Sequence, residues 1–403
     1  MVALPVPERI TRLELPERAD LIGMSVRAAE RELEQLDADG PFLDLTYADT
    51  KRFPPPPGVI ERLLRAAQCD GMTYTPYRGD ATVRADVAEN AGGFLGLDLD
   101  PDRDLIITPG SQSALFCALS AIVDEGERVL LFDPDYLSSE RMLRHLGAEV
   151  RHVPMDWSGE EPGPDLDVLS TELEANPRLV LFSNPNNPTG AVYPESVVRK
   201  IADLVRATPD TLVVVDQLYS RLVFDGGMTH LAALEGLRER TVTLLGPSKS
   251  ESMSGFRLGA AVAPPELIDR MEDVLSLTGL RAPAYAQHML SGWMRDDHEY
   301  MQQRIDEYRP LRDLGVERFN ASPALEVVCP GGTAYMFPRV VGDVPDQVIG
   351  KRLKAEANLI INPGYQSGPR GIGHFRVCFA QQEDAWERAV GDIIKIVEDA
   401  VGG

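Results

Sequence analysis

The sequence predicts an α/β protein in which a mostly parallel sheet, of the seven-stranded type, is sandwiched by helices. From about residue 104, short apolar runs alternate with stretches of helical periodicity. Most of these runs are nearly continuously apolar, as expected of parallel strands that are covered on both faces. After Asn320 the order changes to short strands around proline and glycine, which predicts a smaller α+β domain built from both chain ends. A chain of 403 residues is long enough for two domains.

Proline and helical periodicity divide the first hundred residues. Pro5, Pro7 and Pro16 interrupt residues 1–20, which are therefore expected to form an extended arm. Apolar residues then recur at helical spacing, and the prolines at 54–57 separate a short strand from the next helix. The expected elements are a helix at 21–38 that ends near Asp39-Gly40, a strand at 42–46, and helices at about 57–68 and 80–95.

Seven apolar runs are expected to form the large sheet. They are residues 105–107, 129–132, 149–153, 179–182, 212–215, 242–245 and 258–262. Right-handed crossovers between parallel strands place the carboxyl ends of those strands at one edge of the sheet. Ligands of such sheets bind at that edge, so the residues that follow these runs are the first candidates for a site.

The C-terminal part predicts a different order of elements. A long helical region is expected at 283–315, followed by antiparallel strands at 325–328 and 334–337 around Pro330-Gly331-Gly332. A helix at 346–357, strands at 359–361 and 375–379 and a helix at about 383–400 complete the expected order. We divide the chain into an N-terminal arm with part of the small domain (1–50), a large domain (51–300) and a C-terminal small domain (301–403).

The composition excludes several classes of function. The formal net charge is −23, and such an excess of acid argues against nucleic acid or an anionic membrane as a partner. The four cysteines lie far apart without a Cys-x-x-Cys pair, which predicts neither a zinc site nor a disulfide framework. Neither a signal peptide nor an apolar run of membrane length is visible. We therefore expect a protein of the reduced cytoplasm.

A lysine in a loop of small hydroxyl residues is the most suggestive candidate for chemistry. Lys249 stands between Ser248 and Ser250, soon after the expected strand at 242–245. Burying an amine is costly unless the amine has a function, and a desolvated amine loses its proton more easily and becomes a nucleophile toward a carbonyl. From this stretch alone, an ordinary surface lysine is an equally good interpretation.

Two further loops follow expected strands and could bind a ligand. The loop 109–113, with Ser111 and Gln112, opens a helix, where free backbone N–H groups and a hydroxyl could bind a phosphate. A helix that is merely capped by serine would look the same. The string Asn184-Pro185-Asn186-Asn187-Pro188-Thr189-Gly190 follows the strand at 179–182, and its prolines make the loop rigid. A Pro/Asn-rich turn without a ligand is the alternative interpretation.

Two charged residues lie where a buried charge needs a partner. Asp216 follows the strand at 212–215, with Tyr219 three residues later, and a carboxylate at a buried strand end is expensive unless it meets a cation. A helix cap is the alternative. Arg376 lies within the strand at 375–379, and the planar fork of an inward-facing arginine fits a substrate carboxylate. An internal salt bridge is the alternative here.

Together these features are what pyridoxal phosphate (PLP) requires: a lysine nucleophile, a phosphate seat, a carboxylate for the pyridine nitrogen and an arginine for the substrate. From about residue 40 to its C-terminus the chain resembles the fold-type-I PLP-dependent enzymes, in particular the class I/II aminotransferase family. The string Asn184 to Gly190 matches the N-P-x-N-P-T-G string of that family. The resemblance implies a PLP-binding large domain and transfer of an amino group from an α-amino acid to a keto acid.

The resemblance also implies a role for each matching residue. Lys249 would form the Schiff base with PLP and then act as the base that removes the proton from the substrate Cα. Asp216 would pair with the pyridine nitrogen, Asn187 and Tyr219 would contact the 3′-oxygen, and Tyr136 would stack on the ring. The phosphate would be bound by Ser111, Gln112, Ser248 and Arg257, and by Tyr74 of a partner subunit, which implies a homodimer. Arg376, with Asn187 and Tyr47 nearby, would bind the substrate.

Because of three departures from the family pattern, the sequence does not decide which reaction follows the removal of the Cα proton. Gly246 stands where many members carry a hydroxyl, Gln217 replaces an acid, and the loop 46–53 is polar and charged. Similar strings occur in PLP-dependent oxidases and hydroxylases of arginine, which use dioxygen, although Tyr47 stands where a histidine would be expected. Elimination or replacement at the β or γ carbon, as on S-adenosylmethionine, is a further alternative. A binding module without catalysis is disfavoured because Lys249 and Asp216 are retained.

Overall fold

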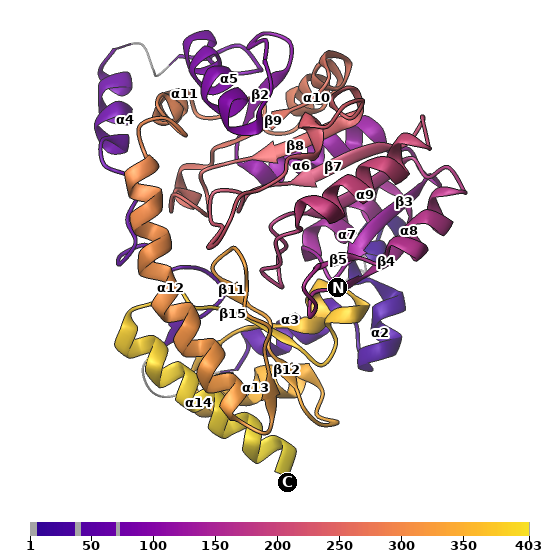
Figure 1. The fold of residues 1–403 in the computed structure, drawn as a ribbon, viewed down its shortest axis with the longest axis vertical. Helices are drawn as coiled ribbons and strands as arrows, with labels where there is room; N and C mark the ends of the chain where they lie inside the picture. The colour runs from indigo at the N-terminus through magenta and orange to yellow at the C-terminus, as the bar shows by residue number, and fades with distance from the viewer. Residues whose placement is uncertain (1–5, 37–41, 70–72, 403) are drawn as a thin grey trace, which may run out of the picture.

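The computed structural model describes residues 6–36, 42–69 and 73–402. Figure 1 shows a large domain built around a sheet and a small domain of helices and short strands, joined by the long helix α12 (His298–Ala321). The prediction of an α/β protein with a mostly parallel sheet and a smaller α+β domain is confirmed. The domain boundaries at residues 50 and 300 stay predictions.

The large sheet contains all seven predicted strands and one more. Its order is β2-β9-β8-β7-β6-β3-β4-β5, where β5 (Gly163–Pro164) is the additional short edge strand. The other strands are β2 (Leu105–Thr108), β3 (Arg128–Asp133), β4 (Glu149–Asp156), β6 (Leu179–Ser183), β7 (Leu212–Asp216), β8 (Thr241–Leu245) and β9 (Gly259–Val262). Strands β4, β3, β6, β7 and β8 are parallel, whereas β9 runs antiparallel to both β8 and β2.

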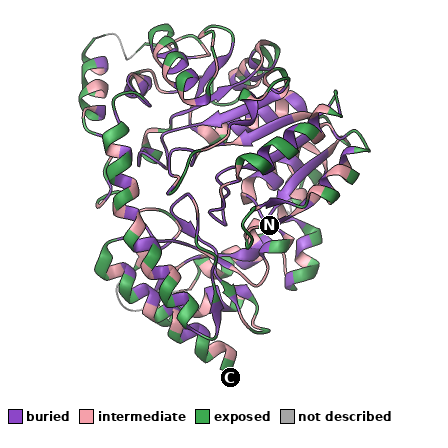
Figure 2. Cartoon of the chain, viewed as in Figure 1, coloured by how far each residue is buried: buried purple, intermediate pink, exposed green. Residues whose placement is uncertain are grey.

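Helices cover both faces of this sheet, which explains why most of its strands are largely apolar. The exception is β4, which lies near the edge and carries Glu149, Arg151 and His152. On β3, Val129 and Leu131 pack toward α6 (Ser111–Ile122), α7 (Leu137–Leu146) and α10 (Pro265–Leu277), whereas Leu130 and Phe132 pack toward α8 (Leu166–Leu173) and α9 (Glu195–Arg206). Helix α5 (Ala81–Leu95) covers the end of the sheet near β2 and β9. Figure 2 shows the strands as buried and the outward faces of the helices as exposed.

The small domain joins segments from both ends of the chain. Strand β1 (Leu43–Asp44) pairs in parallel with β13 (Leu359–Ile360), and β15 (Phe375–Cys378) pairs with both β11 (Tyr335–Met336) and β14 (Asn362–Pro363). Helices α12, α13 (Asp346–Ala357) and α14 (Glu383–Gly402) pack on these strands around the buried Trp386. Other short elements, from both domains, are α4 (Val59–Gln68), η2 (Leu231–Ala233), η3 (Arg238–Arg240), η4 (Ser254–Phe256), η6 (Gly364–Ser367) and η7 (Pro369–Gly371).

The prediction of an extended N-terminal arm is wrong for the described part of residues 1–20. This part holds α1 (Glu8–Thr11), η1 (Arg12–Glu14) and the start of α2 (Pro16–Ile22). Pro16 lies in the first turn of α2, where its missing N–H costs nothing and its fixed φ favours the helix. Gly23, with φ of 75°, separates α2 from α3 (Val26–Glu34), so the helix predicted at 21–38 is interrupted. Its predicted end near Asp39-Gly40 lies outside the described residues.

Two predictions for the C-terminal part also need correction. The helix predicted at 283–315 is divided into α11 (Ala284–Gln287), η5 (His288–Leu290) and α12. The strands predicted to pair around residues 330–332 do not pair with each other, because β10 (Leu325–Glu326) pairs with β12 (Arg339–Val340). The intervening chain binds the large domain instead, with the Gly332 N–H donating to Gly190 O over 2.9 Å.

None of the helices in the described part of the chain is both long and apolar enough to cross a membrane. Across residues 6–36, 42–69 and 73–402, no cluster of three or more histidine, cysteine, aspartate or glutamate side chains could hold a metal ion.

Candidate active site

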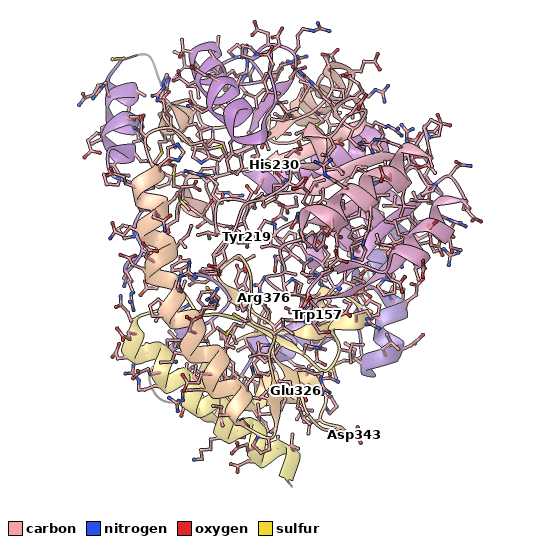
Figure 3. All side chains as sticks on the ribbon, in the orientation of Figure 1. Trp157, Tyr219, His230, Glu326, Asp343 and Arg376 are labelled. Atoms are coloured by element: carbon pink, nitrogen blue, oxygen red, sulfur yellow. The ribbon has the colours of Figure 1, made fainter. Side chains whose placement is uncertain are left out.

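A cavity of about 330 Å³ lies at the carboxyl ends of the parallel strands, between the large sheet and the small domain. Figure 3 places Tyr219 and Arg376 in this region, one from each domain. Eleven of the twelve site residues predicted from the sequence line the cavity: Tyr47, Ser111, Gln112, Tyr136, Asn187, Asp216, Tyr219, Ser248, Lys249, Arg257 and Arg376. Residues more than 250 positions apart in the chain therefore meet in one site. It lies at the carboxyl ends of the parallel strands, where the ligands of such sheets are expected to bind.

The loop that carries Lys249 is fixed by buried charges. Glu251, which is fully buried, accepts hydrogen bonds from Ser250 Oγ, Trp293 Nε1 and Arg221 Nη1, and the Trp293 bond is 2.9 Å long. Arg221 also pairs with Asp297 at 2.7 Å, just before α12 begins. Arg304, an arginine of α12, donates to Ser252 Oγ over 3.0 Å. Lys249 is thus a half-buried amine on a loop that is held from both sides.

A cationic pocket forms where α6 begins. Gly110, with φ of 89°, precedes α6, and a side chain at this position would collide with the guanidinium of Arg257. Arg257 Nη1 donates to Ser254 O over 2.9 Å, and Ser248 Oγ donates to Leu258 O over 3.3 Å. The start of a twelve-residue helix beside an arginine and two serine hydroxyls suits a phosphate, because the helix end and the guanidinium both favour an anion.

Asp216 is the last residue of β7, and Tyr219 follows three residues later; both line the cavity. Asp216 Oδ1 accepts a hydrogen bond from the Leu218 N–H over 3.0 Å. Burial raises the pKa of Asp216 to about 6, although the Leu218 N–H and the charge of Lys249 oppose this rise. Burial also raises the pKa of Tyr219, whose protonated hydroxyl donates to Tyr335 Oη over 3.2 Å. A buried carboxyl of this kind gains most from a cationic N–H partner.

Gln217, one of the three departures, points away from the cavity. Its side chain is buried, and its Oε1 lies 2.9 Å from Nδ1 of His230. Burial lowers the pKa of His230 to about 4, so this ring is neutral near pH 7 and donates to the amide. His230 is labelled above Tyr219 in Figure 3. Gln217 therefore affects the contacts just after β7, through its hydrogen bond with His230, and does not line the cavity.

Two loops are joined behind the cavity by Asn186 and Asp135. Asn186 Nδ2 donates to Pro134 O over 3.2 Å, while Asn186 Oδ1 accepts from the Thr189 N–H over 3.1 Å. Asp135 accepts hydrogen bonds from the N–H groups of Ser183 at 2.8 Å and Tyr136 at 2.6 Å. These hydrogen bonds hold the loop of Asn187 in a fixed position relative to the loop of Tyr136. The side chains of Asn187 and Tyr136 are therefore also held in a fixed relative position.

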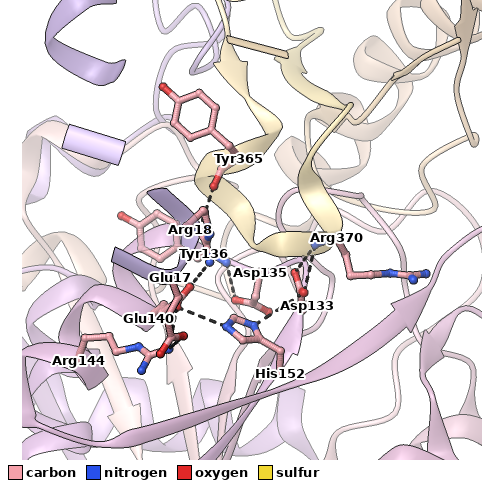
Figure 4. Close-up of polar contacts among 10 residues, drawn as sticks. All are labelled: Glu17, Arg18, Asp133, Asp135, Tyr136, Glu140, Arg144, His152, Tyr365 and Arg370. Carbon is pink, nitrogen blue, oxygen red and sulfur yellow. Dashed lines mark hydrogen bonds and ion pairs between the residues drawn. The ribbon is translucent and has the colours of Figure 1, made fainter. Parts of the chain in front are cut away.

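The N-terminal segment supports the same region from outside. Arg18 of α2 pairs with the buried Glu140 of α7 and donates to Tyr365 O over 3.0 Å (Figure 4). His152 lies 3.3 Å from Glu140 and 3.8 Å from Asp133. Burial opposes ionisation of Glu140, but His152 and Arg18 outweigh it and hold the pKa of Glu140 at about 2. The helix that starts directly after Tyr136 is therefore tied to both domains.

Arg376 enters the cavity from β15 without an acidic partner. Its Nη1 donates to Asn187 Oδ1 over 2.7 Å, and its Nη2 donates to Asn362 Oδ1 over 2.5 Å and to Thr46 O over 3.2 Å. The guanidinium carbon lies 4.0 Å from the ring centre of Tyr335. Among the residues that the structure describes, no carboxylate lies within ion-pair distance of Arg376, so the internal salt bridge considered above is not present. Its half-buried charge therefore remains available to an anion.

The twelfth predicted residue, Tyr74, lies outside this cavity. Its side chain is 84% exposed and borders a separate hollow between α4 and residues 284–291. Arg281 stacks on its ring at 4.8 Å. A side chain that reaches a partner subunit would be exposed in the single chain, and the role of Tyr74 stays a prediction.

Comparison with known proteins gives the family. The family model for class I and II aminotransferases matches residues 44–393. A putative aminotransferase, YugH, of Bacillus subtilis is 30% identical over 335 residues, which is 82% of this chain and 86% of that protein. The aspartate/prephenate aminotransferase of Thermus thermophilus is 29% identical over 346 residues, 85% of this chain and 88% of that protein. An aspartate aminotransferase structure from Rhodobacter sphaeroides superposes with a TM-score of 0.87 at 32% identity, covering 93% of this chain and 100% of that one.

The chain belongs to the class I and II aminotransferase family. It is a PLP-dependent aminotransferase, as its sequence predicted. The comparisons give no support to the dioxygen-using or elimination alternatives. The cavity of this aminotransferase fits PLP on its own observations: a cationic pocket at the start of α6, a carboxyl with a raised pKa at the end of β7, and a lysine between them.

The sequence missed several residues that line the site of the aminotransferase. They are Thr46, Leu115, Leu218, Ser254, Tyr335 and Asn362. Asn362 is a polar residue directly after the predicted strand at 359–361. It could have been predicted if residues that follow strands had been considered in the small domain as well as in the large one. Tyr335 lies inside a predicted strand and gave no separate signal. At Gly246 an added Cβ would be in ordinary van der Waals contact, 3.4 Å from Gly259 Cα and Leu258 O.

Proposed function

We propose that this aminotransferase binds PLP through nine of the eleven predicted residues of the cavity, all except Arg376 and Tyr47, and binds the α-carboxylate of an amino acid on Arg376. The observation that carries the proposal is a half-buried arginine with only neutral partners, in the same cavity as a half-buried lysine and an arginine-flanked helix start. The start of α6 beside Arg257 then suits the cofactor phosphate, and Arg376 suits the carboxylate of the substrate.

Each residue has a physical task in this proposal. Ser111, Gln112, Ser248 and Arg257 bind the phosphate, Tyr136 covers one face of the ring, and Asn187 and Tyr219 donate to its 3′-oxygen. The carboxylate of Asp216 keeps the ring nitrogen protonated. When bound, PLP supplies the electron sink that accepts the electron pair of the Cα–H bond. With PLP bound, Lys249 would hold the cofactor covalently, and its amine, once released, would serve as the base that removes the Cα proton.

Arg376 orients the substrate for that proton transfer. A bidentate pair with the α-carboxylate fixes two atoms of the amino acid, so the Cα–H bond can be held where the Lys249 amine reaches it. A keto acid then occupies the same carboxylate position and accepts the amino group. Tyr47, which is 53% exposed at the mouth of the cavity, is placed to contact the substrate side chain.

We further propose a cytoplasmic homodimer in which Tyr74 completes the phosphate site of the partner subunit. Several large apolar side chains are exposed near Tyr74 and at the end of α10: Ile60, Leu64, Leu277, Leu280 and Tyr285. Apolar side chains gathered at such positions favour burial against a second copy of the chain.

Lys249→Ala tests the central assignment. The wild-type protein with PLP should show the visible absorbance band of lysine-bound cofactor, and the variant should lose this band together with all transamination. Lys200→Ala is the matched control, because Lys200 is an exposed lysine paired only with Glu161. A variant at Lys249 that kept the band would overturn the proposal.

A second experiment identifies the fate of the amino acid. Purified enzyme is incubated with each common amino acid, with and without 2-oxoglutarate, in an oxygen electrode. The proposal expects amino transfer only when the keto acid is present, with no oxygen uptake. Oxygen consumption with an amino acid alone would support an oxidase instead, and release of a leaving group without the keto acid would support elimination.

A further inference from the structure

The neutral partners of Arg376 include one residue that the proposed function leaves unassigned, Asn362. Strands β14 and β15 pair so that Asn362 lies directly opposite Arg376. Side chains opposite each other on paired strands point to the same face, so the pairing itself brings the amide to the guanidinium. The resulting bond from Arg376 Nη2 to Asn362 Oδ1 is 2.5 Å long.

The orientation of the Asn362 amide is determined at both ends. An arginine side chain has only donors, so the oxygen of the amide must face Arg376. The other end of the amide donates, since Asn362 Nδ2 lies 2.9 Å from Gln366 Oε1. Gln366 in turn reaches Glu30 at 3.5 Å, and Glu30 pairs with Arg141 at 2.8 Å.

This chain of contacts separates a carboxylate from the substrate arginine. Two neutral amides, Asn362 and Gln366, stand between Arg376 and Glu30, whose charge is already taken by Arg141. An acidic side chain at position 362 would have the same shape but would give Arg376 a permanent counter-ion. An incoming carboxylate would then have to compete with it and would meet like charge.

We propose that Asn362 is a positioning residue whose neutral amide aims Arg376 into the cavity and keeps its positive charge free for the α-carboxylate. This inference rests on the proposed function, in which Arg376 binds that carboxylate. It adds that recognition depends on the absence of charge at position 362 as much as on the hydrogen bond.

The test compares two reagents that differ by a carboxylate. Aminooxyacetate and methoxyamine both displace Lys249 from PLP through the same amino group, and both reactions are followed by the loss of the visible band of the cofactor-loaded enzyme. Only aminooxyacetate carries a carboxylate for Arg376. The ratio of the two second-order rate constants therefore reports carboxylate recognition, whichever amino acid is the natural substrate.

Asn362→Asp should lower that ratio by about 10- to 100-fold, since a charged hydrogen bond must be displaced. The rate with methoxyamine should stay within about twofold of wild type. Asn362→Ser removes the amide without adding charge and should lower the ratio by less than about tenfold. Gln303→Glu is the control, because it places the same new charge on the exposed face of α12.

The outcomes separate this inference from the function on which it rests. If Arg376→Ala abolishes the preference for aminooxyacetate but Asn362→Asp keeps the wild-type ratio, only the role of Asn362 is wrong. If the wild-type protein and Arg376→Ala show the same ratio, the assignment of Arg376 itself fails. A larger effect of Asn362→Ser than of Asn362→Asp would show that shape, and not neutrality, is what matters.

Discussion

At the scale of single residues, the site is defined by charges that lack partners. Arg376 is held by an amide oxygen of each domain and a backbone carbonyl, and Asp216 by one backbone N–H. Other buried charges in the described chain are paired, as for Arg221 with Asp297 and Arg18 with Glu140. Since an unpaired charge that is partly shielded from water is costly, Arg376 and Asp216 are the groups of this cavity that a ligand would stabilise.

Asp216→Asn should have opposite effects on stability and activity. The pKa of Asp216 is raised from 3.8 to about 6, so its ionised form is disfavoured in the folded protein. In the cofactor-free protein this carboxyl therefore lowers the free energy of unfolding as pH rises from about 4 to about 6, and the cost stays constant above that. The amide removes the cost, so the cofactor-free variant should gain about 3 kcal/mol at pH 8 and little at pH 4.

Activity should change in the other direction, because the amide cannot keep the ring nitrogen protonated. We expect kcat/KM for transamination to fall by about 10²- to 10³-fold. Urea unfolding of the cofactor-free proteins at pH 4 and pH 8 measures the first effect, and steady-state kinetics measure the second. Asp210→Asn, at an exposed position, should change neither. An unaltered unfolding midpoint for Asp216→Asn at pH 8 would contradict the raised pKa.

At the scale of elements, the sequence was most informative where one pattern decides the structure. Runs such as 179–182 and 212–215 are apolar throughout because both faces of the sheet are covered, and each became a strand. The predicted pairing of 325–328 with 334–337 failed because the chain between them binds Gly190 and Leu222 of the large domain. Such contacts between distant segments are absent from any local pattern. The same is true of α2, whose Arg18 reaches Glu140 of α7.

Arg221→Met should test how α12 and the Lys249 loop are connected. The substitution leaves Glu251 and Asp297 buried without their shared counter-ion, which costs about 3–5 kcal/mol of the free energy of unfolding. Since Glu251 lies two residues after Lys249, the variant should also need more PLP to reach its full visible band. Chemical unfolding at pH 7 and titration with PLP measure the two effects.

The matched control is Arg199→Met, because Arg199 and Glu195 form a pair in which both side chains are more than half exposed. Its effect on stability should be below about 0.5 kcal/mol. Equal losses for the buried and the exposed arginine would show that the network around Glu251 contributes nothing specific.

At the scale of the whole molecule, the site exists only because the two domains meet. Lys249, Asp216 and the start of α6 come from the large sheet, whereas Arg376, Asn362 and Tyr335 come from the small domain. Most of the residues that line the cavity could be predicted from the sequence, since they follow or lie in strands that the sequence predicts. It could not predict which members touch, because the bond between Arg376 and Asn187 depends on how the domains pack.

The proposed dimer extends this division of the site to a second chain, and a hybrid of two inactive variants tests it. Lys249→Ala removes the nucleophile, and Tyr74→Ala removes the exposed ring that should reach the partner's phosphate. In a heterodimer of the two variants, the site of the Tyr74→Ala subunit keeps its own Lys249 and receives the intact tyrosine from the other chain. The second site lacks both groups, so the purified heterodimer should show about half the wild-type activity. If Tyr74 served its own subunit instead, neither site would be complete and the heterodimer would be no more active than the two homodimers.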